Sequence, residues 1–462
     1  MSAAALWLYG LAMRLARPLL RCHLRRRGGQ EPLYLESVPE RFGLYLRPAP
    51  EGPGPRVWVH AVSLGETRTA ALLLPHLRAQ WPGMRLLLTH GTATGRTEGL
   101  RLLREGDVQA WLPWDDPQAV TRFLDHFRPA LGLLMETEVW PTLVAQCRRQ
   151  HIPLALVSAR MSRRSQLRAQ RLPWLSRAAF GDLAAVWAQT PDDARRLAEL
   201  GAVSPRVLGN LKFDAQPDAA QLAQGRALRA AAGRPVILLA SSRDREEAAL
   251  LQIIQTFWAS SPVEQGKSAT NLEADQAAPQ WLIVPRHPQR FDAVADLLRA
   301  AGLRVARRSA GGVWPPPAAA DGAPTIWLGD TLGEMALYYG LSDVALLGGS
   351  FEPLGGQNLI EAAACACPVV MGPHTFNFAQ AADDAEAAQA ACRVPSLEAA
   401  VALARELLAD RPRRAAMAHA GEKFTAAHAG AANRVAVAAA GLLSGDTARG
   451  TGRLPLREPA AR

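Results

Sequence analysis

Residues 57–66 read Val57-Trp-Val-His-Ala-Val-Ser-Leu-Gly-Glu66, so a continuous apolar run passes into a short polar loop. A helical pattern follows over residues 67–80, and a second apolar run occupies residues 85–89. Strands that are buried on both faces of a parallel sheet have such continuous runs, whereas half-exposed strands alternate. The stretch therefore predicts a strand–helix–strand unit of an α/β fold.

The same alternation occurs in two series, which a region with few apolar runs at residues 210–233 separates. The first series of expected strands is at residues 57–62, 85–89, 108–113, 130–135, 153–157 and 185–189. The second is at residues 235–240, 281–285, 304–307, 325–329, 344–347 and 368–371, and a C-terminal helix is expected at residues 411–441. We predict two doubly wound, Rossmann-like domains that face a central cleft, where ligands bind at the carboxyl ends of the strands.

Composition agrees with a folded chain of more than one domain. The sequence has 462 residues, of which 49% are hydrophobic, and this length suits two domains with separate cores. Its five cysteines are an odd number at no metal-ligand spacing, which favours a reducing cytoplasm over a disulfide framework. We expect domains at residues 30–212 and 213–444, a polar surface insertion at residues 260–280 and a disordered tail at residues 445–462.

The N-terminal segment, residues 1–29, combines an apolar stretch with six arginines, and the whole chain carries a net charge of +10. The apolar run is too short for a membrane-spanning helix, which needs about 20 residues. A helix here would place Trp7, Leu11, Leu15 and Leu19 near one face, which is typical of a helix lying in the bilayer interface. The alternative is an amphipathic helix packed on the body of the protein.

Glu66 is the strongest candidate for a catalytic residue. It stands at the start of a helix, directly after the first strand, where a carboxylate can also serve as a helix cap. Gly65 allows close approach of a substrate, and the loop lies at the expected mouth of the cleft. From the loop alone, capping and catalysis remain equal explanations.

Two carboxylates follow the fourth expected strand, in Met135-Glu-Thr-Glu-Val-Trp-Pro141. Carboxylates so close to a buried strand are costly unless they are paired or used. We assign Glu136 to the site and expect a structural salt bridge at Glu138. Lys212, near the crossover between the domains, could neutralise a leaving phosphate, although a solvated surface lysine is the alternative.

The second half has three loops that suit a nucleotide phosphate. Arg286 and His287 follow one expected strand, Gly329-Asp-Thr-Leu-Gly-Glu334 follows another, and the glycine-rich residues 348–361 lead into a helix. Glycines before a helix leave backbone N–H groups free to hold a phosphate. No P-loop, no Gly-x-Gly-x-x-Gly at the first helix and no Asp-x-Asp after a strand is present, so the sequence requires neither a cofactor nor a metal.

Together these loops resemble the 3-deoxy-D-manno-octulosonic acid (Kdo) transferases of bacterial lipopolysaccharide synthesis. The matching stretches, in chain order, are His60-Ala-Val-Ser-Leu-Gly-Glu66, Met135-Glu-Thr-Glu-Val-Trp-Pro141, Gly209-Asn-Leu-Lys-Phe-Asp214, Val284-Pro-Arg-His-Pro288, Gly329-Asp-Thr-Leu-Gly-Glu334, Gly348-Gly-Ser-Phe351, Gly355-Gly-Gln-Asn358 and Val370-Met-Gly-Pro-His-Thr-Phe-Asn-Phe378. The resemblance implies a GT-B fold with an N-terminal acceptor-binding domain, a C-terminal donor-binding domain and an N-terminal membrane-anchor helix.

The resemblance also implies an inverting transfer of Kdo from CMP-Kdo to a lipid A precursor (lipid IVA) at the cytoplasmic face of the inner membrane. Glu66 matches the family's general base, and Glu136 and Lys212 match residues that assist the transition state. The positions that match its CMP-binding residues are Pro285, Arg286, Leu332, Gly333, Glu334, Asn358, Leu359, Ile360 and Glu361. Gln357 stands where many members have His and Leu332 where Met is common, which puts a charged imidazole at position 357 in doubt.

Two other functions are weighed against this one. A sugar-nucleotide 2-epimerase or a lipid-linked N-acetylglucosaminyltransferase would share the fold but bind UDP. A nucleic-acid-binding protein would explain the positive charge, but the arginines lack interleaved aromatic residues and no nucleic-acid-binding module is present. We therefore expect no nucleic-acid partner.

Overall fold

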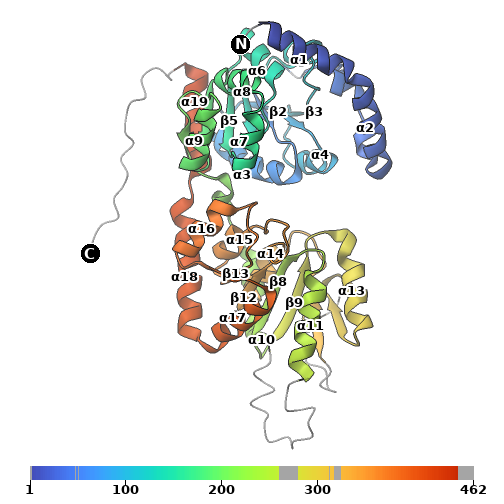
Figure 1. Ribbon diagram of the computed structural model, residues 1–462, viewed down its shortest axis with the longest axis vertical. Helices are drawn as coiled ribbons and strands as arrows, with labels where there is room; N and C mark the ends of the chain where they lie inside the picture. Colours follow the sequence, from blue (N-terminus) through green and yellow to red (C-terminus); the bar gives the residue numbers. More distant parts are fainter. Residues whose placement is uncertain are drawn as a thin grey trace, which may run out of the picture. The chain divides into compact units, whose positions relative to one another are not determined.

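The structure is a computed structural model, and it describes residues 3–46, 48–49, 51–259, 279–311, 313–316 and 324–445. The chain divides into two compact units (Figure 1). Unit 1 contains the residues up to Asp214 together with those from Ala429 onward, and unit 2 contains Ala215–His428. The tail expected at residues 445–462 and the insertion expected at residues 260–280 lie outside the described residues, apart from residues 279, 280 and 445.

Unit 1 is built on a sheet of seven parallel strands in the order β3-β2-β1-β4-β5-β6-β7. Its strands are β1 (Arg56–His60), β2 (Arg85–His90), β3 (Val108–Trp111), β4 (Leu131–Met135), β5 (Leu154–Ala159), β6 (Ala185–Ala188) and β7 (Arg206–Val207). Its helices are α1 (Ala3–Leu15), α2 (Arg17–Gln30), α3 (Leu64–Gln80), α4 (Ala93–Leu100), α5 (Pro117–Phe127), α6 (Pro141–Arg149), α7 (Arg163–Ala169), α8 (Pro173–Gly181), α9 (Pro191–Glu199) and α19 (Ala431–Ser444). Side chains from α3 and α19 form the core on one face of the sheet, and α5, α6, α8 and α9 cover the other.

Unit 2 repeats this plan with a parallel sheet in the order β10-β11-β9-β8-β12-β13-β14. Its strands are β8 (Val236–Ser242), β9 (Gln280–Pro285), β10 (Arg304–Arg307), β11 (Thr325–Leu328), β12 (Val344–Leu347), β13 (Val369–Met371) and β14 (Ala391–Arg393). Its helices are α10 (Ala219–Ala231), α11 (Glu246–Ala259), α13 (Phe291–Ala300), α14 (Met335–Gly340), α15 (Leu359–Ala364), α16 (Ala379–Ala387), α17 (Leu397–Ala409) and α18 (Arg411–His428). The prediction of two doubly wound α/β domains is confirmed.

The domain boundary differs from the expected one at the C-terminal end of the chain. We assigned residues 213–444 to the second domain, but α19 packs in the core of unit 1, where Val435 and Ala436 are fully buried beside α3. The Asp214 carboxylate stabilises the start of this helix by accepting hydrogen bonds from the backbone N–H groups of Gly430 and Ala432. Helical periodicity does not say which domain a helix joins, so the sequence could not reveal this return.

The N-terminal segment forms two helices rather than one. α1 buries Leu6 and Gly10 and leaves Trp7 and Leu15 65% and 72% exposed, so an apolar face is left uncovered, as the periodicity predicted. None of the helices among the described residues is long and apolar enough to cross a membrane. Contact with a bilayer therefore stays a prediction.

Candidate active site

The acidic residues singled out from the sequence lie at the point where the strand order of the first sheet reverses. β1 has β2 on one side and β4 on the other, so the two connections leave in opposite directions. Glu66 is in the first turn of α3, just after β1, and Glu136 directly follows β4. In doubly wound sheets, the crevice at such a switch point is where ligands bind.

Glu66 is both a capping residue and a partly buried carboxylate. Ser63 caps α3 by accepting a hydrogen bond from the Glu66 backbone N–H at 3.4 Å, and the backbone N–H of Val62 donates to Glu66 Oε2 at 2.7 Å. Burial raises the pKa of the Glu66 carboxyl to about 7 and outweighs the opposing hydrogen bond from Val62, while the charges of Glu136 and Glu138 raise it further. A carboxylate with a pKa near 7 has a proton affinity suited to a general base.

Glu136 holds the ion pair of this site. Its carboxylate Oε1 accepts from Lys212 Nζ at 2.8 Å, and Lys212 lies on the short 3-10 helix Leu211–Asp214. The structure therefore brings together two of the residues that the sequence selected, 76 positions apart. The salt bridge that we expected at Glu138 is formed by Glu136 instead, and burial raises the pKa of the Glu138 carboxyl.

The backbone conformation of Glu136 is unusual. Its φ angle is +56°, a left-handed conformation that side chains other than glycine adopt at a cost of about 1 kcal/mol. Its side chain is only 11% exposed, so the ion pair with Lys212 compensates a charge that has lost most of its solvation. Strained residues of this kind cluster at functional sites.

Two buried histidines support the loop that carries Glu66. His90 Nδ1 lies 2.9 Å from the carbonyl oxygen of Ala61, and His60 Nδ1 lies 2.9 Å from Thr89 Oγ1. Burial lowers the pKa of His60 to about 3 and that of His90 to about 4, so both rings are neutral at pH 7. These neutral, enclosed imidazoles therefore hold the end of β1 and the loop that carries Glu66 through hydrogen bonds.

In unit 2, the structure brings two of the expected nucleotide loops together. Arg286 follows β9 and donates through Nε to Gln357 Oε1 at 3.2 Å, across from the loop that follows β12. Gln357 is one of the two departures from the family pattern, and here its amide oxygen is the acceptor for the arginine. Leu332, the other departure, is 68% exposed.

The remaining residues that we expect to bind the CMP-Kdo donor fall into three groups. Glu334 accepts from Arg308 at 2.9 Å, and this bond holds the pKa of the Glu334 carboxyl below its usual range. Asn358 caps α15, and its side-chain oxygen accepts from the backbone N–H of Ile360 at 3.2 Å. Residues packed within the unit or at turns complete the set: Pro285 and Leu359 are buried, Ile360 is 1% exposed, Gly333 has a φ of +82° and Glu361 is in the first turn of α15. The side chains of Leu359 and Ile360 are buried in unit 2, and a contact of these two positions with CMP stays a prediction.

The glycine-rich loop after β12 also differs from expectation. We expected free backbone N–H groups, but Glu246 Oε2 accepts from the N–H of Gly349 at 2.8 Å and Oε1 accepts from that of Phe351 at 3.2 Å. Glu246 is 1% exposed and comes from α11, more than 100 positions earlier. These two N–H groups are therefore already satisfied by a buried carboxylate.

Sequence reasoning missed the end of β8 and the loop that connects it to α11, which together read Ser241-Ser-Arg-Asp-Arg-Glu-Glu247. β8 lies between β9 and β12, so this loop occupies the switch point of the second sheet. Ser241 has a φ of +55°, and Arg243 lies close enough to His287 to lower the pKa of that imidazole, after the larger effect of burial. The signal was available, because the loop directly follows an expected strand like the three that we selected.

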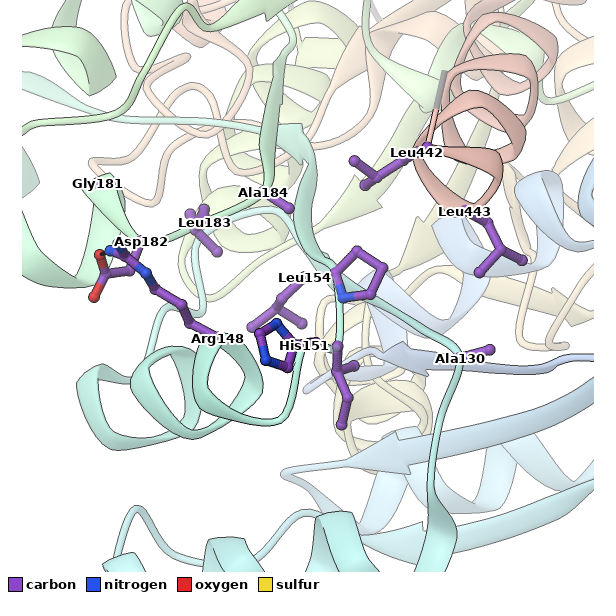
Figure 2. A pocket seen from close by; sticks show the side chains of 13 residues that line it. Ala130, Arg148, His151, Leu154, Gly181, Asp182, Leu183, Ala184, Leu442 and Leu443 are labelled. Atoms are coloured by element: carbon purple, nitrogen blue, oxygen red, sulfur yellow. Dashed lines mark hydrogen bonds and ion pairs between the residues drawn. The ribbon is translucent and has the colours of Figure 1, made fainter. Parts of the chain in front are cut away.

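A cavity of about 630 Å³ lies elsewhere in unit 1 (Figure 2). Ala130, Leu154 and Ala184 line it, and they stand at the beginnings of β4, β5 and β6, whereas Glu66 and Glu136 follow strand ends. Arg148 and Asp182, which form an ion pair, lie at its rim. The cavity thus lies at the N-terminal ends of these strands, whereas the candidate active site lies at the C-terminal ends of the strands of the same sheet.

Comparisons with known proteins agree with the sequence resemblance. A family model described as 3-Deoxy-D-manno-octulosonic-acid transferase (kdotransferase) matches residues 36–215, and one described as Glycosyl transferases group 1 matches residues 323–424. The chain is 48% identical to the 3-deoxy-D-manno-octulosonic acid transferase of Bordetella pertussis, over 92% of this chain and 96% of that protein. It is 31% identical to the 3-deoxy-D-manno-octulosonic acid transferase of Haemophilus influenzae, over 80% and 82% respectively.

Among solved structures, a putative UDP-N-acetylglucosamine 2-epimerase from Listeria monocytogenes superposes with a TM-score of 0.54 at 13% identity. The match covers 86% of this chain and 98% of that one. At this identity the likeness concerns the fold alone. It confirms the expected GT-B class of two Rossmann-like domains, and it gives no support to an epimerase activity.

Proposed function

Because the chain belongs to the 3-deoxy-D-manno-octulosonic acid transferase family, and is therefore a glycosyltransferase, we propose that it transfers Kdo from CMP-Kdo to a lipid A precursor with Glu66 as general base. The observation that carries the assignment of the base is the Glu66 carboxyl, held by Val62 at the end of β1 with a pKa of about 7. CMP-Kdo as the donor, lipid IVA as the acceptor and inversion at the anomeric carbon are parts of this proposal.

The proposed reaction is a single displacement. The Glu66 carboxylate takes the proton from an acceptor sugar hydroxyl, whose oxygen attacks the anomeric carbon of Kdo on the face opposite the phosphate. The bond between that carbon and the phosphate oxygen breaks, and CMP leaves with the electron pair. Attack from the opposite face inverts the anomeric configuration.

Each unit has a cationic side chain at its candidate binding loops. In unit 1, Lys212 is paired with Glu136, a carboxylate whose charge helps to raise the pKa of the proposed base Glu66. In unit 2, Arg286 stands at the end of β9, where a guanidinium can bind the phosphate of CMP in bidentate fashion. CMP is a monophosphate, so arginine and lysine side chains suffice for its charge without a metal in this proposal.

We also propose that the enzyme acts at the cytoplasmic face of the inner membrane as a peripheral protein, where its lipid-linked acceptor resides. Support comes from the exposed apolar side chains of α1, among them Trp7 and Leu15, and from the arginines of α2. Such a pattern suits a helix in the interface of an anionic bilayer.

The test is a transfer assay with CMP-Kdo and a tetra-acylated lipid A precursor, in which the anomeric configuration of the product is determined by NMR. We expect Glu66→Ala to abolish transfer while CMP binding, measured by calorimetry, is kept. Glu138→Gln serves as the control, because it neutralises a nearby, partly buried carboxylate that is assigned no role in the transfer. Since the charge of Glu138 helps to raise the pKa of Glu66, the variants are compared at pH 8, where Glu66 is largely ionised in either case. Tight binding of a UDP-sugar without any response to CMP would refute the donor assignment.

A further inference from the structure

A second basic and apolar surface lies on unit 1, outside the N-terminal segment. Residues 160–181 contain six arginines and neither Asp nor Glu. They form α7, α8 and their connection, which leave Leu167 and Leu172 49% exposed and Trp174 47% exposed. We call this the α7–α8 surface and define it by the exposed side chains of Arg164, Leu167, Arg168, Arg171, Leu172 and Trp174.

The arginines of the α7–α8 surface are exposed to solvent. Among the described residues, none of Arg164, Arg168 and Arg171 forms an ion pair with a carboxylate. By contrast, Arg195 and Arg196 of the neighbouring helix α9 both pair with Asp192 at 2.9 Å. Exposed arginines that lack acidic neighbours present a net positive charge, which attracts an anionic partner.

The apolar residues of the surface are not the packing face of their helices. α8 turns Ala179 and Phe180 into the core of unit 1, and α7 turns Gln166 inward to a hydrogen bond with Glu199. The exposed leucines and Trp174 therefore do not pack in the core of unit 1. Tryptophan and leucine beside arginine are typical of protein segments that sit at the level of lipid head groups.

The surface is continuous with the N-terminal segment, because α1 packs directly against α6 and α8. α1 is fixed there by the hydroxyl of Tyr9, which hydrogen-bonds Asp115, and α2 by Arg17, which pairs with Asp116 at 2.8 Å. Residues 3–30 likewise have exposed tryptophan and leucine, several arginines and no acidic residue. Two neighbouring parts of unit 1 thus have the same chemistry.

We propose that the α7–α8 surface is a second membrane contact, in which its arginines bind the head groups of anionic lipids while Trp174, Leu167 and Leu172 enter the interface. α7 begins just after β5, which pairs with β4, the strand that ends at Glu136. The contact therefore holds the bilayer next to the strand ends that carry the proposed base. The inference rests on the proposed membrane association of residues 1–29 only for the continuity of the two surfaces.

The experiment measures cosedimentation of the full chain with phosphatidylcholine vesicles that contain or lack phosphatidylglycerol. We expect the triple variant Arg164→Gln, Arg168→Gln, Arg171→Gln to lose binding to the anionic vesicles, because each arginine at an anionic surface contributes roughly fivefold to affinity at low salt. Trp174→Ser with Leu172→Ser should weaken binding to both the anionic and the neutral vesicles. These residues are exposed, so folding should be kept, and circular dichroism checks it.

A matched control removes the same charge from other exposed sites, with the variant Arg104→Gln, Arg206→Gln, Arg411→Gln. Equal losses in control and test variants would show a nonspecific effect of net charge and overturn the inference. If only a variant of the N-terminal segment, Trp7→Ser with Leu11→Ser, releases the protein, the inference fails while the proposed membrane association stands. If the unaltered chain does not bind vesicles, both fail, and a changed oligomeric state with unchanged vesicle binding would identify a protein interface instead.

Discussion

The Glu66→Gln variant tests the proposed base through two independent pH dependences. Glutamine keeps the size of the side chain and an oxygen that can accept the hydrogen bond from Val62, which is 2.7 Å in the protein. It removes the titration of the carboxyl, whose pKa burial raises to about 7. Activity and stability should therefore both lose a pH dependence that the unaltered enzyme has.

The effect on activity follows from the ionised fraction of Glu66. With a pKa of about 7, roughly a tenth of the carboxyl is ionised at pH 6 and roughly nine-tenths at pH 8, so kcat/KM should rise about tenfold between them. Removal of a general base typically costs about 10²- to 10⁴-fold in rate. We expect Glu66→Gln to be slower by this factor at pH 8 and to lack the rise with pH.

The effect on stability has the opposite sign. The folded protein binds the Glu66 proton more tightly than the unfolded chain, in which the pKa is near 4.5, so the free energy of unfolding falls as pH rises from 4.5 through 7. At 1.36 kcal/mol per pKa unit the full shift corresponds to about 3 kcal/mol, which solvent screening of a partly exposed group reduces to about 1–2 kcal/mol. Relative to the unaltered chain, Glu66→Gln should gain this amount between pH 5 and pH 8 in urea denaturation.

Two results would refute the reasoning. A Glu66→Gln variant that keeps more than a tenth of the activity at pH 8 would reduce Glu66 to a helix cap. A stability difference between variant and unaltered chain that is constant from pH 5 to pH 8 would show that the folded state does not raise the pKa of this carboxyl.

Three further predictions concern the surroundings of the site. Lys212→Met leaves the buried Glu136 carboxylate without its partner, so we expect a loss of about 2 kcal/mol in urea denaturation and a loss of transfer activity of at least tenfold; unchanged values would make the pair dispensable. Arg286→Ala should weaken CMP binding at least tenfold in calorimetry without a change in melting temperature, and equal affinities would exclude this arginine from the donor site. Asp115→Ala removes the acceptor of two buried N–H groups at the start of α6, which should cost about 2–4 kcal/mol in chemical denaturation, and a loss below about 1 kcal/mol would contradict this account.

The strands were predictable where each is apolar along its whole length. Twelve runs were expected, and each coincides with an observed strand to within about two residues at either end. β7 and β14 were missed because they have only two and three residues, and both residues of β7 are exposed at the sheet edge. A strand that short has too few residues for a hydrophobic pattern.

The candidate site was predictable as a set of loops but not as a set of contacts. That Glu136 and Arg286 follow strands could be read from local pattern, and parallel topology then places strand ends at one edge of each sheet. The partners could not be read in this way. Lys212 reaches Glu136 from 76 positions away, and Glu246 reaches the N–H of Gly349 from 103. Only the tertiary structure decides which of two nearby carboxylates is paired.

Capping and catalysis, which were equal explanations of Glu66 from the sequence, are compatible in the structure. The bond from Val62 and the Ser63 cap fix the carboxylate at the start of α3, as a capping residue requires. The hydrogen bonds that the Val62 N–H and the Ser63 hydroxyl donate to the carboxylate favour its charged form and on their own would lower the pKa of Glu66, yet burial outweighs them. A general base needs both a fixed position and a proton affinity near the working pH. The cap supplies the position, and the enclosure beside Glu136 supplies the proton affinity, so the structural role is a condition of the proposed catalytic one.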